Sequence, residues 1–146
     1  ILYFLKAMGK VDSIMVSEAS QRKIPMLVQI FLMALLLSKS VSLTVLPELF
    51  FFYLSGILSA LLAYVFLFLK IKISIHTLGI SSLTIFVIAL SIHDNTNLIS
   101  SVALLILCNG LVASSRMVMN AHTTKELLLG FAIGIFPQLA LLRFWL

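Results

Sequence analysis

The sequence predicts an all-α fold, a polytopic bundle of transmembrane helices that forms a single integral membrane domain over residues 1–146. The chain is 62% hydrophobic and 10% charged, whereas soluble domains have about 45–50% apolar and about 25% charged residues. Its mean hydropathy is +1.20. The apolar residues form long runs without the strict alternation of membrane β-strands, and in lipid only helices or closed barrels satisfy the backbone.

The first two spanning helices are predicted at residues 25–37, or a little beyond, and at residues 47–69. Pro25 suits a first helical turn, where a missing N–H costs nothing. The first run is short for a bilayer core of about 30 Å, but Lys39 can extend it by reaching toward the interface. The second run contains small residues that allow close helix packing: Ser55, Gly56, Ser59 and Ala60.

Three further spanning helices are predicted in the second half of the chain: residues 74–92, 98–113 and 125–146. Pro137 predicts a kink in the last of them. The connection HDNTN at residues 93–97 is a turn by composition, and we expect His93 and Asp94 to be solvated. The opening ILYFLKAM, residues 1–8, fits the tail of an earlier helix, so we expect a clipped N-terminal helix besides the five visible ones.

Basic residues gather on one side of the predicted bundle, which we call face one. Short connections return the chain to this side before residue 25, at residues 70–76 and at residues 114–125. Eight of the ten Lys and Arg residues fall there: Lys6, Lys10, Arg22, Lys23, Lys70, Lys72, Arg116 and Lys125. Two explanations of these cations stay open: the positive-inside rule and a pocket for an anionic headgroup. The positive-inside rule does not account for His76 and His122, which lie on the same face.

The segment SSRMVMNAHTTKELLLG, residues 114–130, carries the densest polar groups. Such groups are costly at a membrane boundary and by default indicate a functional site. The guanidinium of Arg116 suits phosphate oxygens. His122 becomes a competent nucleophile when a carboxylate holds its second nitrogen, and Glu126 stands one helical turn away. The alternative is an ordinary pair at a helix start, with Glu126 favoured by the helix dipole.

Two segments earlier in the chain also lie on face one. KIKISIHTLG contains Lys72, Ser74 and His76 at the start of a helix, where a histidine can also be a simple interfacial residue. QRKIP places Arg22 and Lys23 before the first helix, where these cations can reach a phosphate or merely anchor the helix.

The order of these segments resembles the three signatures of the membrane-bound type 2 phosphatidic acid phosphatase superfamily. The third segment is similar to the family's Ser-Arg…His…Asp signature, with Glu126 in place of Asp. The second is similar to Pro-Ser-Gly-His, with Ile73 and Ile75 in place of Pro and Gly. The first matches loosely, because Ile24 separates the cations from the proline and the expected Lys is missing. The resemblance covers roughly residues 10–135.

The resemblance implies a metal-independent phosphatase acting on lipid phosphates or lipid pyrophosphates. His122 would form a phosphohistidine, Glu126 would orient it, and His76 would protonate the leaving oxygen and then activate water. Six residues are candidates for holding the phosphate, the last two as alternatives: Arg116, Ser115, Ser74, Lys72, and Arg22 or Lys23. A family member usually has six spanning helices, which fits five plus a clipped one. We expect no cofactor, and no metal because the sequence has no dense set of ligands.

Two other functions stay open. One is a catalytically inactive relative that binds phospholipid or serves as a structural membrane subunit. The other is a small transporter subunit. Such a subunit would need polar residues at mid-membrane depth, and Ser59 and Asn109 are few for that purpose. The expected partners are a lipid phosphate and membrane lipids, with no nucleic acid. We expect a bacterial inner-membrane protein with an inert Cys108. The sidedness of the site, the lipid and the oligomeric state are left open.

Overall fold

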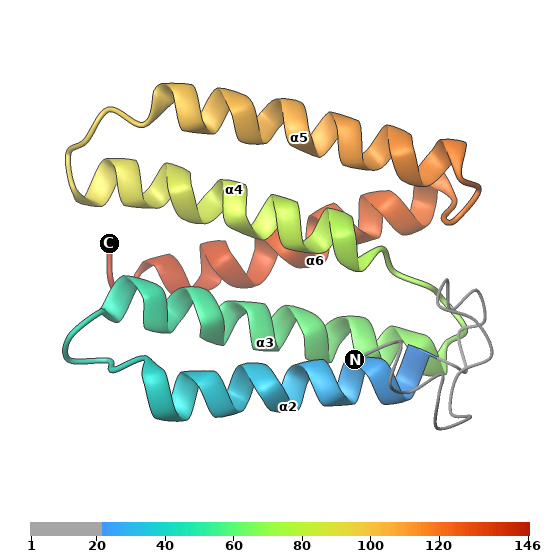
Figure 1. Cartoon of the computed structure of the whole chain (residues 1–146), viewed down its shortest axis with the longest axis horizontal. Coiled ribbons are helices and arrows are strands. Elements are labelled where there is room, and N and C mark those ends of the chain that lie inside the picture. Colours follow the sequence, from blue (N-terminus) through green and yellow to red (C-terminus); the bar gives the residue numbers. More distant parts are fainter. Residues whose placement is uncertain (1–21) are drawn as a thin grey trace.

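The computed structural model describes residues 22–146, and within this range it contains five helices and no strand. The helices are α2 (Lys23–Ser40), α3 (Pro47–Phe68), α4 (Ile75–His93), α5 (Ile99–Val118) and α6 (Thr124–Leu142), shown in Figure 1. Each is long and apolar enough to cross a membrane. The predicted all-α bundle of five spanning helices is therefore confirmed. The expected earlier helix, together with Lys6 and Lys10, lies outside the described residues.

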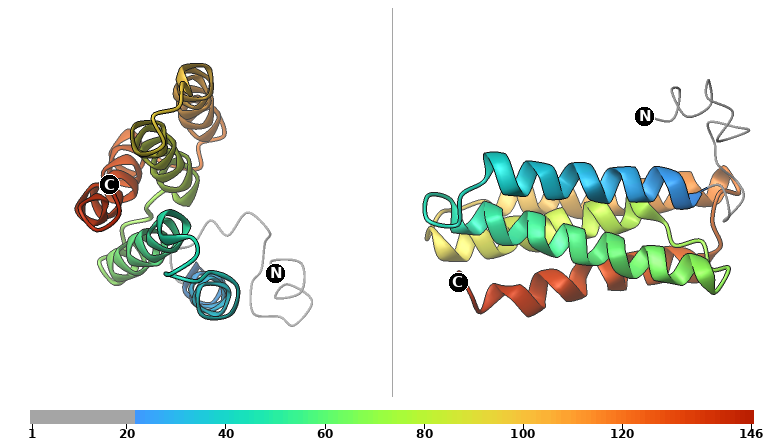
Figure 2. Two further views of the ribbon diagram at one scale, coloured as in Figure 1. Left: turned by 90° about the vertical axis from the view of Figure 1, so that its left-hand side faces the viewer. Right: turned by 90° about the horizontal axis from the view of Figure 1, so that it is seen from below.

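Consecutive helices run in opposite directions, so the bundle has two ends (Figure 1). The starts of α2, α4 and α6 and the ends of α3 and α5 share one end, which is face one. We call the other end face two. Seen along the helices, α3, α4 and α6 form the middle of the bundle, while α2 packs beside α3 and α5 beside α4 at opposite edges (Figure 2).

Two helix ends differ from the prediction in ways that matter for the site. The fourth predicted helix runs on to Val118, so Ser115 and Arg116 lie in the last turn of α5 rather than in a loop. It ends where Asn120 takes a left-handed backbone conformation with φ of 49°, which asparagine tolerates better than most residues. The last helix ends at Leu142, four residues earlier than predicted.

Glycines bring α4 and α6 into close contact beneath face one. A Cβ atom on Gly130 would collide with the hydroxyl of Thr77, and one on Gly134 with the hydroxyl of Ser81 and the backbone of α4. Thr77 and Ser81 each donate a long hydrogen bond of 3.4 Å to a main-chain carbonyl of α6. Gly130 and Gly134 are four residues apart and therefore lie on the same side of α6, which allows this approach. The close contact holds the start of α4 against the start of α6.

Helix α6 continues through Pro137, which is buried. Proline has no N–H to give to the carbonyl four residues earlier, that of Ile133. The hydroxyl of Ser59, on α3, donates to this carbonyl at 2.9 Å. Ser59 thus supplies the hydrogen bond that Pro137 cannot make, and it ties α3 to α6.

Polar side chains other than Ser59 and Asn109 also lie inside the bundle. Gln138 is 1% exposed, and its amide donates to the hydroxyl of Ser82 at 2.8 Å and to the carbonyl of Phe52. Asn109 on α5 donates to the hydroxyl of Thr84 on α4 at 2.7 Å. These groups bind one another across helices, so they act as cross-links of the bundle.

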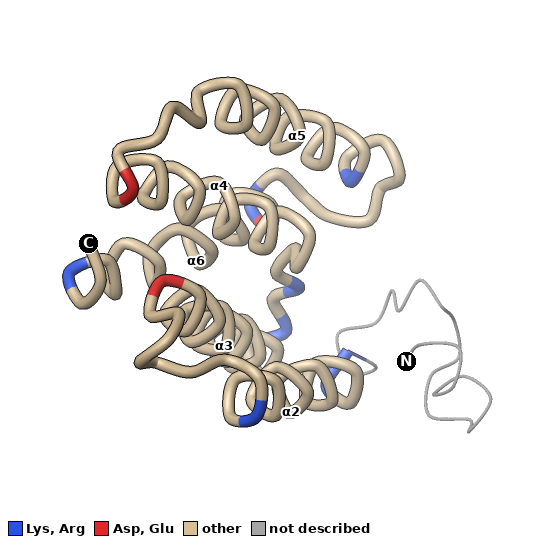
Figure 3. Tube along the Cα trace, turned by 60° about the vertical axis from the view of Figure 1, so that its left-hand side comes forward, with Lys and Arg blue, Asp and Glu red and all other residues tan. Residues whose placement is uncertain are grey.

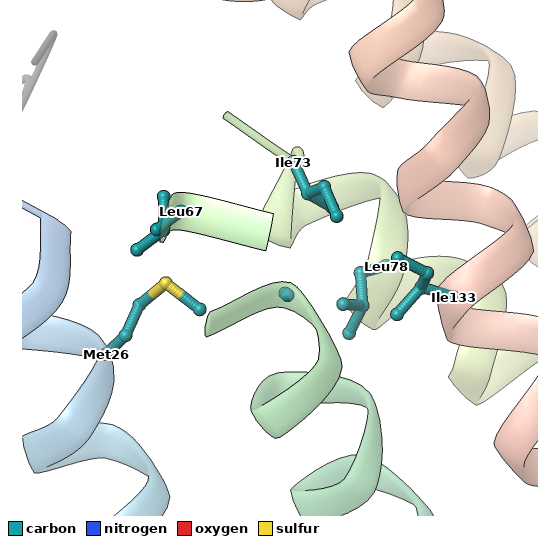
Figure 4. Packing of buried hydrophobic residues seen from close by; sticks show 6 residues of the cluster. Met26, Leu67, Ile73, Leu78 and Ile133 are labelled. Atoms are coloured by element: carbon teal, nitrogen blue, oxygen red, sulfur yellow. The ribbon is translucent and has the colours of Figure 1, made fainter. Parts of the chain in front are cut away.

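A hydrophobic cluster lies directly below face one and joins α2, α3, α4 and α6 (Figure 4). Its buried members are Met26, Ala63, Leu67, Ile73, Leu78 and Ile133. Ile73, which stands where the phosphatase signature has proline, is 3% exposed within this cluster. The isoleucine thus anchors the segment between α3 and α4 by packing.

His93 and Asp94 are both exposed, as expected, but the sequence did not predict the contacts that His93 makes. Its Nε2 lies 3.4 Å from Oε1 of Glu48, in the first turn of α3. Its ring also meets the indole of Trp145 edge-on, with centroids 5.6 Å apart. The fold brings the end of α4 beside the start of α3 at face two, which no spacing in the sequence reveals.

Candidate active site

Most lysines and arginines of the described residues lie at face one, as Figure 3 shows in blue. The three sequence segments converge there. Arg22 and His122 are 100 residues apart in sequence and in contact in space. Lys72 and His122 are 50 residues apart and also in contact. The convergence that the motif order predicts is present in the fold.

His122 lies in the connection between α5 and α6, and its side chain is 4% exposed. Its Nδ1 is 3.0 Å from the main-chain carbonyl of Lys72 and 3.4 Å from Oε2 of Glu126. Its Nε2 is 3.5 Å from Nη1 of Arg22. Because arginine can only donate and a carbonyl can only accept, one neutral tautomer satisfies all three contacts. In it Nδ1 carries the proton and Nε2 keeps its lone pair.

The electrostatics favour this neutral ring. Burial lowers the pKa of His122 below its ordinary value, and the charge of Arg22 lowers this pKa further. Glu126 and the Lys72 carbonyl act in the opposite direction without cancelling the shift. Burial also lowers the pKa of Arg22, partly offset by Glu126, but an arginine stays charged. An unprotonated Nε2 therefore faces a permanent cation.

Glu126 has two roles in the structure. Its Oε2 accepts a hydrogen bond of 2.9 Å from the N–H of Thr123, and its own N–H donates to the Thr123 hydroxyl at 3.3 Å. This is a capping box at the start of α6, a motif that uses Glu or Gln at this position. The same Oε2 faces His122. The capping box is therefore present, and the same geometry is compatible with the interpretation of Glu126 as an orienting carboxylate.

His76 and Arg116 complete the site. His76 is exposed in the first turn of α4, near enough to Arg116 and Arg22 for both charges to act on its ring. The Nε of Arg116 is buried and has no hydrogen-bond partner among the described residues. An unsatisfied buried donor costs about 1–3 kcal/mol, so an anionic acceptor would relieve this cost.

Three of the predicted phosphate-binding residues make other contacts. Ser74 is fully buried, and its hydroxyl caps α4 by accepting from the N–H of Thr77. Ser115 is exposed, with its hydroxyl 3.9 Å from the sulfur of Met119, the residue that follows α5. The ammonium of Lys23 lies 4.5 Å from the ring centroid of Phe68, a cation–π distance. The structure thus gathers His122, Glu126, His76, Arg22, Arg116 and Lys72, and it gives Ser74, Ser115 and Lys23 structural contacts.

Two groups of the site escaped the sequence analysis. The Lys72 carbonyl is the nearest partner of His122 Nδ1, and a main-chain atom has no signal in a sequence. Thr123 did have one, because Thr123-x-x-Glu126 is a capping-box pattern. Within residues 22–146, no three His, Cys, Asp or Glu side chains lie close enough together to hold a metal ion.

No family model, curated protein or solved structure matches this chain. The likeness to the type 2 phosphatidic acid phosphatases therefore rests on the motifs quoted above.

Proposed function

We propose that this chain is a membrane-embedded, metal-independent phosphatase of lipid phosphates or lipid pyrophosphates, working through a phosphohistidine on His122. The observation that carries the proposal is the state of this ring. Its Nδ1–H is held by the Lys72 carbonyl and Glu126, while its Nε2 lone pair faces Arg22. A phosphate that replaces the 3.5 Å contact between Nε2 and Nη1 would meet a nucleophile and a cation at once.

In the first step, Nε2 of His122 attacks phosphorus, and the bond from phosphorus to the lipid oxygen breaks. Protonated His76 gives its proton to that leaving oxygen. Charge on the three equatorial phosphoryl oxygens is stabilised by Arg22 and Arg116, with the cation of Lys72 nearby. Glu126 stabilises the positive charge that forms on the His122 ring.

In the second step, neutral His76 takes a proton from water, and the hydroxide attacks phosphorus. The nitrogen–phosphorus bond breaks and returns the electron pair to Nε2, so inorganic phosphate leaves and His76 is protonated again. Every proton and electron pair is accounted for without a metal or cofactor.

The place of the site supports a lipid substrate. Five apolar helices end around it, so a headgroup at face one leaves its hydrocarbon chains beside the helices. We place the protein in a bacterial inner membrane, as a single domain.

The phosphohistidine gives a direct test. The purified protein in detergent, mixed with a lipid carrying radiolabelled phosphate and quenched in base, is expected to retain label that acid then releases. Phosphohistidine is stable in base and labile in acid, whereas phosphoserine shows the opposite stability. His122→Gln is expected to retain no label. Label of undiminished amount on His122→Gln would reject the proposed nucleophile.

One observation favours a second candidate, a relative that binds a lipid phosphate without cleaving it. Ser74 and Ser115, which the resemblance assigns to the phosphate, contact other groups in this structure, while the open Nε of Arg116 suits anion binding alone. Saturable binding of a lipid phosphate without phosphate release would support this candidate over the enzyme.

A further inference from the structure

A pocket of about 160 Å³ lies between α2, α3 and α4, and its wall extends from Met26 and Ile75 near face one to Phe52 in the face-two half of α3. Apolar side chains and glycines form most of its wall, and Gln29 and Ser82 are its polar members. Ser82 is already engaged, because its hydroxyl accepts from Gln138. The pocket is therefore suited to hydrocarbon and unsuited to a charged or strongly polar ligand.

The pocket and the phosphate site share two helices, α2 and α4. Met26, in its wall, follows Arg22 by one helical turn on α2, and Ile75 directly precedes His76 on α4. From there the wall continues along α4 to Ser82, seven residues or about 10 Å further at 1.5 Å per residue. Arg22 and Met26 are thus one turn apart at the start of α2, which places the pocket within reach of a chain attached to a phosphate at face one.

Helices α2 and α4 lie on either side of α3 (Figure 2). The exposed lining residues are on α2 and α4, so the mouth of the pocket lies between these two helices. Its floor is buried, with Ala63 1% and Leu78 6% exposed. At its mouth, Gln29 and Gly79 are exposed. A Cβ atom built on Gly79 meets nothing within 4 Å. This glycine thus leaves space open at the mouth, unlike Gly130 and Gly134, which are required for packing.

The volume suits a segment of one hydrocarbon chain. Pockets that enclose whole drug-sized ligands measure about 300–1,000 Å³, and a cavity of about 150 Å³ accepts a single benzene ring. A pocket of about 160 Å³ thus holds a segment of one hydrocarbon chain and not two chains side by side.

We propose that this pocket holds one hydrocarbon chain of the lipid whose phosphate lies at His122, with Gly79 keeping the mouth open. The inference rests on the proposed function and extends it to the choice of substrate. The enzyme would distinguish lipid phosphates by the chain next to the headgroup and would favour single-chain or slender lipids.

The test compares two substrates on one variant. Gly79→Leu fills the mouth with a side chain that has room to fit. With a long-chain acylglycerol phosphate, kcat/KM is expected to fall about tenfold or more, the equivalent of two methylene groups losing their burial. With a water-soluble aryl phosphate, which has no chain, the rate is expected to stay unchanged, and this substrate also reports that the variant is folded. Gly79→Ala is expected to give a smaller loss in the same direction.

Gly110→Leu is the matched control. Gly110 is exposed on α5, a Cβ there also meets nothing within 4 Å, and it does not line the pocket. Its long-chain to soluble rate ratio should equal that of the unsubstituted protein. An unchanged ratio in Gly79→Leu, or an equal fall in Gly110→Leu, would overturn the pocket while leaving the phosphatase in place. Failure of the unsubstituted protein to cleave either substrate would overturn both proposals.

Discussion

The two ends of the bundle carry the same chemical pair in different surroundings. At face one, His122 lies 3.4 Å from Glu126, and at face two His93 lies 3.4 Å from Glu48. The side chain of His122 is 4% exposed, whereas that of His93 is 33% exposed. A close imidazole–carboxylate pair is therefore not by itself a site.

The neighbours of each pair make the difference. Around His122 lie the guanidinium of Arg22, which faces Nε2, and a carbonyl that fixes the tautomer. Around His93 lies the indole of Trp145, within an aromatic cluster that also includes Phe86. Cations make the first pair a place for an anion, whereas aromatic packing makes the second a link between helices.

Exchanging each histidine for asparagine should give the largest contrast. His122→Asn removes the proposed nucleophile, so phosphate release from a lipid phosphate is expected to fall to the level without enzyme. His93→Asn should retain the full rate, because no proposed step involves face two. Both rates are measured in detergent as free phosphate. Equal losses in the two variants would mean that the ends do not differ in function.

The arginines at the two ends offer the next contrast. Arg116 has an unpartnered buried Nε, whereas the guanidinium of Arg143 lies over the ring of Phe144 at face two. Arg116→Lys keeps the charge but loses the planar fork of donors. We expect kcat/KM to fall by about 10²–10³, the usual cost of one donor to a developing oxyanion. Arg143→Lys should leave kcat/KM unchanged, and a similar fall there would contradict the assignment.

The sequence was sufficient for the fold and for the convergence at face one. Long apolar runs joined by short connections leave little freedom in where each loop returns, so Arg22, Lys72 and His122 could be placed on one face by counting helices. The direction of each side chain could not be predicted this way. Ser74 turned inward because the start of α4 needs a cap, and Ser115 became part of α5 because that helix continues to Val118.

The pH dependence of the rate should show a smaller effect at His122. Attack needs neutral His122, so kcat/KM should fall as pH drops through its pKa, which burial and Arg22 lower. Arg22→Met removes the second cause and should move this acid limb to higher pH. The stability of the fold should also decrease as pH drops. Below the ordinary histidine pKa the unfolded chain binds a proton that folded His122 does not, so the free energy of unfolding decreases as pH falls through that window. An acid limb unmoved by Arg22→Met would exclude the proposed contact.

Substitutions of Glu126 should separate its contribution to the start of α6 from its contribution to catalysis. Glu126→Gln retains the capping box, and the Lys72 carbonyl still holds Nδ1 of His122. We expect about a tenfold loss of kcat, equivalent to one stabilising interaction with the charged ring, and an unchanged melting temperature. Glu126→Ala should lose activity similarly and also about 1 kcal/mol of stability, the usual worth of a cap. A normal melting temperature for Glu126→Ala would contradict the structural role.

Loss of the contact between Glu48 and His93 at face two should have the smallest effect on stability and rate. Partly exposed ion pairs contribute about 0–1 kcal/mol, so Glu48→Gln is expected to change the unfolding free energy by no more than that and to leave phosphate release unaltered. Trp145 is the chain's single tryptophan and touches the His93 ring, so its fluorescence reports this corner of the bundle alone. A change in that fluorescence with an unchanged rate would show that the ends are independent. A change in both would mean that the helices transmit strain from face two to His122, and the similarity of the two pairs would then have a functional meaning.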